Sequence, residues 1–166
     1  MPFDPSFRPL AHFTPRRNWM NDPNGMLFHE GEYHLFFQHN PYGWGWANMH
    51  WGHAVTTDLV YWHHLPVALY PDELGTIFSG SAVIDWRNTA GLGPETMVAI
   101  YTHDIPNGPD QCLATSQDAG RTWTKYAHNP VVPNTIPLPD FRDPKVFWYS
   151  SDPIADPAAG RWVLLL

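Results

Sequence analysis

Short runs of apolar and β-branched residues, each bounded by turn-forming residues, recur along the 166-residue chain. No segment keeps the 3.6-residue apolar period of a helix over any length, so the pattern predicts strands. We expect ten of them, at residues 25–28, 33–38, 51–56 and 61–65, then 77–85, 97–103, 112–116 and 123–126, then 145–149 and 162–166. A Glu30-Gly31 turn between the first two predicts a hairpin. The strands therefore form sets of four, four and two.

The two complete sets share a weak repeat between their third and fourth strands. An Ala-x-Thr-x-Asp string starts at Ala54 and leads to Trp62, and an Ala-x-Ser-x-Asp string starts at Ala114 and leads to Trp123. Units of four antiparallel strands repeated at this period predict an all-β fold of the β-propeller class. An ordinary β-sandwich with coincidental turns is the alternative.

The repeat also predicts where polar groups meet. Asp22 precedes the first strand of the first set, Ser79 lies near the start of the first strand of the second set, and Asp143 precedes the first strand of the third. The first strand of each propeller blade lines the central channel, so these three residues should converge on one funnel mouth. Convergent carboxylates in an aromatic-lined pocket are what glycoside hydrolysis requires.

Composition and charge narrow the function classes. The net charge is -7 and only 15% of residues are charged, which argues against nucleic acid as a partner. The chain has nine Trp, more than a core of this size needs, and their flat rings can stack on sugars. The single cysteine, Cys112, excludes a disulfide framework and a Cys-based zinc site, and we expect it to be a small buried residue.

Two features concern location and chain ends. No stretch approaches the length of a membrane span, so we expect no membrane partner, and residues 1–5 lack the regions of a signal peptide. The expected location is the cytoplasm, or outside the cell if a leader was left off. Residues 161–166 form a bare apolar strand whose unpaired edge would invite aggregation, and this predicts a fragment.

Ten histidines raise the question of a metal. His50 and His53 are separated by two residues, and His63 and His64 are adjacent. No His-Glu-x-x-His motif is present, and an odd offset along a strand sends His50 and His53 to opposite faces. We therefore expect no metal site and no cofactor, with most histidines packed or hydrogen-bonded locally.

Two longer motifs are far more specific. Residues 19–25 read Trp-Met-Asn-Asp-Pro-Asn-Gly around Asp22, and residues 141–147 read Phe-Arg-Asp-Pro-Lys-Val-Phe around Asp143. Together they resemble the signature of glycoside hydrolase family thirty-two, the β-fructofuranosidases, which include invertases, inulinases and levanases. The resemblance extends from about His12 to the last residue. It implies a five-bladed β-propeller of which residues 1–166 are the N-terminal part, about two and a half blades, with the remaining blades and a C-terminal β-sandwich absent.

The resemblance also implies roles for individual residues. It makes Asp22 the nucleophile that attacks C2 of a fructosyl unit, and Asp143 the transition-state stabiliser. Seven further residues match substrate-binding positions of the family: Trp19, Asn21, Gln38, Trp46, Phe78, Ser79 and Arg142.

One departure from the family pattern matters. The family's general acid is a Glu in a Glu-Cys motif downstream of Arg-Asp-Pro. The Glu residues of this chain are Glu30, Glu32, Glu73 and Glu95, and none precedes a Cys or follows Asp143. We expect the acid to lie beyond the chain end and the 166 residues alone to be inactive and poorly soluble.

The leading interpretation is part of a retaining β-fructosidase that releases terminal fructose from fructans or sucrose. Residues 77–83 and 99–102 look closer to inulinases and levanases than to plant invertases. Fructosyl transfer within the same family and a non-catalytic sugar-binding module remain alternatives. A sialidase is a further one, because the Ser-x-Asp-x-Gly-x-x-Trp string at 116–123 resembles an Asp-box, but sialidases use a Tyr nucleophile and an Arg cluster. The oligomeric state, and β-2,1 against β-2,6 linkage preference, stay open.

Overall fold

The computed structural model describes residues 6, 8–9, 12–105, 108–136, 138–152, 156 and 158–166. Its regular structure is ten strands: β1 (Trp19–His29), β2 (Glu32–Asn40), β3 (His50–Thr56), β4 (His63–Leu69), β5 (Thr76–Asp85), β6 (Thr96–Asp104), β7 (Asp110–Ser116), β8 (Thr124–Lys125), β9 (Lys145–Ser150) and β10 (Gly160–Leu165). No helix in the described part of the chain is long and apolar enough to cross a membrane.

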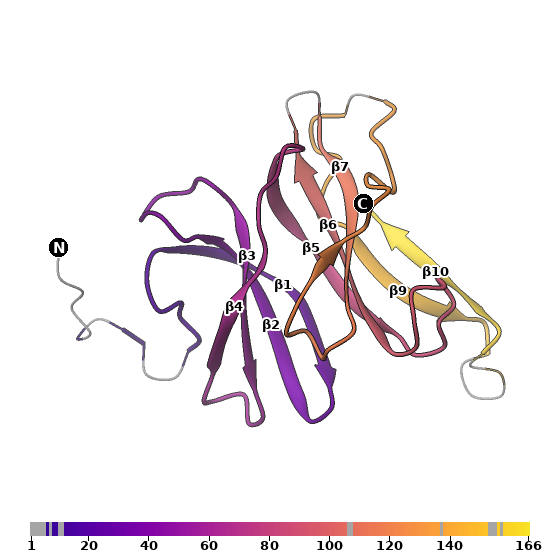
Figure 1. Cartoon of the computed structure of the whole chain (residues 1–166), viewed down its shortest axis with the longest axis horizontal. Helices are drawn as coiled ribbons and strands as arrows, with labels where there is room; N and C mark the ends of the chain where they lie inside the picture. Colours follow the sequence, from indigo (N-terminus) through magenta and orange to yellow (C-terminus); the bar gives the residue numbers. More distant parts are fainter. Residues whose placement is uncertain are drawn as a thin grey trace.

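The strands form three antiparallel sheets in the predicted sets of four, four and two. The orders are β1-β2-β3-β4, β5-β6-β7-β8 and β9-β10, so every sheet is a meander of neighbours in sequence. Figure 1 shows them side by side, from the indigo first sheet through the pink second sheet to the yellow third. The first strands adjoin, because β5 packs against both β1 and β9. This is the arrangement of propeller blades around an axis, and it confirms the predicted fold class.

A buried aromatic cluster holds the first two sheets together. Phe36 and Trp51 from the first sheet, and Tyr101 from the second, are fully buried in it. Cys112 is buried in the same cluster, as its sequence context predicts. Fully burying an apolar side chain of this size contributes about 1.5–3 kcal/mol, so the contact between sheets is a major source of stability.

The local turn chemistry explains two boundaries. The Glu30-Gly31 turn has positive φ at both residues (48° and 85°), and it joins β1 to β2 as predicted. The fourth strand was predicted at 61–65 and begins later, at His63. The reason is Asp58, whose Oδ1 accepts hydrogen bonds from the backbone N–H groups of Val60 and Tyr61 at 2.8 Å and keeps those residues in the turn.

The first strand also differs from its prediction. Asp22 was expected to precede the strand, but β1 starts at Trp19 and Asp22 lies within it. The register shifts between Met20 and Pro23, so that Asn21 and Asp22 together oppose one residue of β2, Gln38. A β-bulge therefore accommodates the turn-forming Asn-Asp-Pro string inside a strand.

Candidate active site

One cavity of about 230 Å³ gathers residues from the first two sheets, from the loop between β2 and β3 and from the loop that enters β9. Its lining consists of Asn21, Asp22, Gln38, Trp46, Phe78, Ser79, Arg142 and Asp143. The structure thus brings together every sequence-predicted site residue except Trp19. Asp22, Ser79 and Asp143 meet although they are far apart in the sequence, because the inner strands of adjacent sheets lie side by side.

Asp22 and Ser79 are directly bonded across the first two sheets. The Ser79 hydroxyl donates to Asp22 Oδ2 at 2.8 Å. Ser79 also sits in a bulge, because the register of β5 against β6 shifts between Ile77 and Gly80. Bulges re-aim side chains at the rims of sheets, and these two turn a carboxylate and a hydroxyl toward each other.

Asp143 lies on the loop that enters β9, as predicted, and its backbone is in the left-handed region at φ 61°. Partial burial raises the pKa of its carboxyl group; the Arg142 guanidinium lowers this pKa and the charge of Asp22 raises it. The side chain still reaches solvent in the cavity. Arg142 forms an ion pair with Asp140, with Nη2 2.9 Å from Oδ1.

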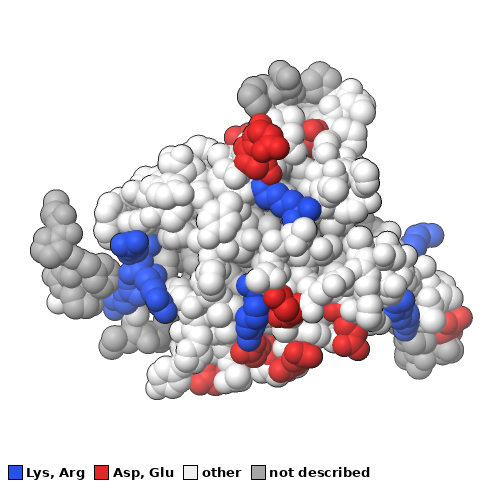
Figure 2. Space-filling view, in the orientation of Figure 1, with Lys and Arg blue, Asp and Glu red and all other residues white. Residues whose placement is uncertain are grey.

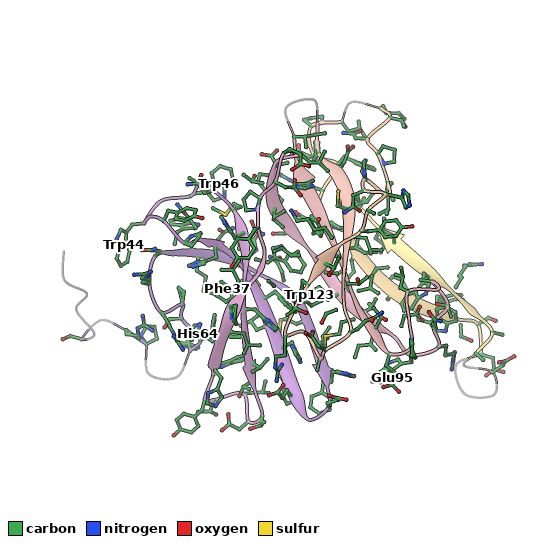
Figure 3. All side chains as sticks on the ribbon, viewed as in Figure 1. Phe37, Trp44, Trp46, His64, Glu95 and Trp123 are labelled. Atoms are coloured by element: carbon green, nitrogen blue, oxygen red, sulfur yellow. The ribbon has the colours of Figure 1, made fainter. Side chains whose placement is uncertain are left out.

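Aromatic rings form one rim of the cavity. The rings of Trp46 and Phe78 lie edge to face, with centroids 5.8 Å apart. Trp46 is 58% exposed and lies on the loop between β2 and β3, at the upper left in Figure 3. An exposed indole at a polar cavity offers an apolar face to a sugar ring.

Trp19 and Gln38 differ in their position relative to the cavity. Gln38 lines the cavity and is buried. Trp19 is half-buried and contacts the site through a neighbour, with its Nε1 donating to Asn21 Oδ1 at 2.8 Å. This bond holds the side chain of Asn21, which lines the cavity.

Sequence reasoning missed Asn24, which is buried under the cavity floor. With its amide oriented to satisfy its neighbours, Oδ1 accepts from Gln38 Nε2 at 3.2 Å and Nδ2 donates to Ser79 Oγ at 3.3 Å. Asn24 therefore links two lining residues from different sheets. Its place two residues after Asp22 in the Trp19-to-Gly25 string was the available signal.

The other residue types that could supply an acid or bind a metal do not lie at the cavity in the described part of the chain. In the part of the chain that the structure describes, no Glu lines the cavity and no group of three or more His, Cys, Asp or Glu could hold a metal ion. His53 packs instead against another histidine, with its Nε2 3.0 Å from His34 Nδ1. On the face drawn in Figure 2, Lys and Arg form separate groups, and some of these lie beside Asp or Glu.

Comparison with known proteins is consistent with this architecture. Residues 12–155 match the Glycosyl hydrolases family 32 N-terminal domain. A levanase of Bacillus subtilis is 59% identical over 99% of this chain, which spans 24% of that protein. An extracellular exo-inulinase of Aspergillus awamori is 46% identical over 98% of this chain, which spans 34% of that protein.

A solved structure shares the fold. The fructofuranosidase of Schwanniomyces occidentalis, complexed with fructose, superposes with a TM-score of 0.88 at 40% identity, covering 99% of this chain and 33% of its own. The chain thus spans about a quarter to a third of the length of these relatives. From the family match and these identities, the chain belongs to glycosyl hydrolase family 32 and forms part of its N-terminal five-bladed β-propeller domain.

Proposed function

We propose that this chain carries the fructosyl-binding part of a retaining β-fructosidase site, which acts on terminal fructose units of fructans or sucrose. The observation that carries the proposal is that Asp22 and Asp143 face one cavity together with Arg142 and aromatic rings. Two carboxylates flanking a sugar are the core of glycoside hydrolysis. The levanase and exo-inulinase that resemble this chain are named for levan and inulin, which supports the substrate class.

Asp22 is the nucleophile in this proposal. Its Oδ2 is held by the Ser79 hydroxyl, which leaves Oδ1 for bond formation. A bond forms from Asp22 to C2 of the fructosyl unit while the bond from C2 to the leaving oxygen breaks. Water then hydrolyses the covalent ester and restores the carboxylate, with overall retention at C2.

Asp143 and Arg142 grip the same fructosyl unit in this proposal. Carboxylate and guanidinium groups make strong charge-assisted hydrogen bonds to hydroxyls. A carboxylate fixed beside the ring also stabilises the positive charge that develops in the transition state. Asn21, Gln38 and the Trp46 ring complete the pocket for the sugar.

The general acid comes from outside the cavity lining described above. The leaving oxygen needs a proton, and none of the Glu residues of this chain lies at the cavity in the described part. Two of them contact other residues: Glu32 forms an ion pair with Arg121, and Oε1 of Glu30 lies 4.0 Å from Nε2 of His29. We infer that residues 1–166 are the N-terminal part of a longer catalytic unit and that alone they do not turn over substrate, since general acid help is worth about 10²–10⁴-fold.

The test uses the complete polypeptide that carries these 166 residues. An activated, mechanism-based fructosyl reagent should add its mass to the peptide that contains Asp22, and Asp22→Asn should remove the label. Fructose should be the sole early product from inulin and levan. Labelling of another residue would overturn the nucleophile. Binding of fructan without labelling or turnover would indicate a sugar-binding module, and fructosyl transfer to sucrose as the main reaction would indicate a transferase.

A further inference from the structure

The loop that carries Asp143 is held in an unusual backbone conformation by side chains that do not touch the cavity. Asp143 has φ 61°, which is disfavoured for a residue with a Cβ and persists only where the surroundings impose it. Those surroundings are three buried polar residues, Ser81, Thr102 and Gln111. They come from β5, β6 and β7, the first three strands of the second sheet.

Thr102 and Gln111 hold the loop before and at Asp143. They are direct partners across β6 and β7, and the Thr102 hydroxyl donates to Gln111 Oε1 at 2.8 Å. The same Thr102 oxygen accepts from the backbone N–H of Asp143 at 3.0 Å. Gln111 Nε2 in turn donates to the backbone carbonyl of Phe141 at 2.7 Å. The pair therefore fixes the backbone on both sides of Arg142.

Ser81 holds the chain just after Asp143. Its hydroxyl donates to the carbonyl of Pro144 at 2.8 Å and accepts from the N–H of Val146 at 2.9 Å. Ser81 lies two residues from Ser79, the partner of Asp22, on the same strand. One strand, β5, is thus bonded at Ser79 to the first carboxylate and at Ser81 to the segment that carries the second.

All three side chains form at least one hydrogen bond to the backbone of this loop. Thr102 and Gln111 are fully buried and Ser81 is 5% exposed. Removing one of these side chains leaves a backbone N–H or C=O of the loop without its partner, which favours movement of the loop over retention of its shape. Small displacements of a group that meets the transition state have large effects on rate.

We propose that Ser81, Thr102 and Gln111 are positioning residues that set the place of Asp143 relative to Asp22, and so control the rate of fructosyl transfer to the enzyme without touching substrate. This inference rests on the proposed function of Asp143.

The first measurement compares two threonines on one strand, in the complete polypeptide. Thr102→Val should lower kcat about tenfold or more while KM changes little, because the displaced group acts mainly in the transition state. Thr102→Ser retains the hydroxyl and should restore most of kcat. Thr96→Val is the matched control: Thr96 is also fully buried on β6 and bonds the backbone at Leu92 and Gly93, away from the cavity. It should affect thermal stability only. Ser81→Ala tests the other side of the loop and should resemble Thr102→Val.

A double-variant cycle separates positioning from general weakening. If Thr102 acts through Asp143, adding Thr102→Val to Asp143→Asn should lower kcat by less than about twofold further. Full additivity, or unchanged kcat in both Thr102→Val and Ser81→Ala, would overturn the positioning role. If Asp143→Asn leaves no measurable turnover, the kcat of Thr102→Val is compared with that of Thr102→Ser, and equal values would overturn the positioning role. Wild-type kcat in Asp143→Asn would instead overturn the proposed function of Asp143.

Discussion

The first and second sheets each have a β-bulge in their first strand, opposite one residue of the second strand, but the two bulges present different side chains. In the first sheet, Asn21 and Asp22 bulge opposite Gln38. In the second sheet, Phe78 and Ser79 bulge opposite Thr102. The first bulge presents a carboxylate to the cavity, with its opposing residue also in the lining, whereas the second presents a ring and a hydroxyl, and its opposing residue supports the next loop.

The third strands of the two sheets also correspond. Trp51 is the β3 partner of Gln38, and its Nε1 donates to the carbonyl of Phe78, at the entry to the second sheet, at 2.9 Å. Gln111 is the β7 partner of Thr102 and donates to the carbonyl of Phe141, at the entry to the third. Each sheet therefore fixes the start of the next with one buried side-chain N–H.

Removing the charge at the first bulge should have the largest effect. We expect Asp22→Asn in the complete polypeptide to lower kcat/KM by at least about 10⁴-fold, because no covalent intermediate can form. Fructose release measures activity, and circular dichroism checks that the fold is intact. Asp104→Asn, at the exposed end of β6, is the control and should remain active. Substantial activity in Asp22→Asn would show that the first bulge does not carry the nucleophile.

Removing the charge of Asp143, on the loop that the second sheet supports, should have the second-largest effect on activity. Asp143→Asn should lower kcat by about 10²–10³-fold through lost electrostatic stabilisation. The shape of the pH profile should stay the same, because in our proposal Asp143 transfers no proton. Rates measured from acid to neutral pH decide this. A limb that disappears in Asp143→Asn would make that residue an acid or a base.

Away from the cavity, a buried histidine pair on β2 and β3 of the first sheet, His34 and His53, should make stability depend on pH. Burial is the main cause that lowers the pKa of His34 to about 4 and that of His53 to about 3. Arg121 lowers both further, His29 adds to the shift at His34 and His34 to the shift at His53, while Glu32 opposes the shift at His34. Their folded-state pKa values lie below the unfolded value near 6.5, so the unfolded state gains protons first. Stability is therefore complete above that pH and is lost as the pH falls through 6.5 toward 3–4.

Between pH 7 and pH 5 we expect the free energy of unfolding to fall by about 2 kcal/mol for each histidine, or about 4 kcal/mol for the pair. Urea unfolding at the two pH values measures it. The double variant His34→Gln/His53→Gln is the control and should show a smaller difference between them. An equal difference in the variant would assign the pH dependence to other groups.

Ser79→Ala tests the second bulge directly. Loss of the hydroxyl that donates to Asp22 Oδ2 should lower kcat by about tenfold, the value of one hydrogen bond to a charged group. The sheets should stay folded, because the change removes one oxygen atom and leaves the pairing of β5 with β6 intact. Initial rates at saturating substrate measure the effect. An unchanged rate would mean that the bulge alone, without its hydroxyl, orients the carboxylate.

The smallest effect should be on stability at the histidine pair. Gly120 has φ 76°, and a Cβ there would lie 3.2 Å from His34 and 3.3 Å from His53. Gly120→Ala should therefore lower stability by about 1 kcal/mol and leave kcat unchanged. Gly31→Ala is matched, because Gly31 also has positive φ but open space around its Cβ position. The excess loss in Gly120→Ala over Gly31→Ala, read from thermal melts, reports the packing against the histidines.

Much of the fold could be predicted because it depends on local turns. The Glu30-Gly31 hairpin and the Thr/Ser-x-Asp turns follow from residue types a few positions apart, and Thr56 and Ser116 donate to Asp58 and Asp118 as such turns require. Strand boundaries were less predictable where turn bonds compete with pairing, as at Tyr61. The position of Asp22 within β1 could not be read either, because a bulge depends on the register of the partner strand.

The sequence by itself determined the strand sets, the propeller class and most residues that line the cavity. These follow from turn-forming residues and from motifs whose residues are contiguous in the sequence. Only the tertiary structure decided how those residues are held. Asn24, Ser81 and the Thr102–Gln111 pair look like ordinary polar strand residues until the sheets are assembled. The physical reason is that their partners are backbone and side-chain groups distant in sequence, and a hydrogen bond to a distant group leaves no local pattern.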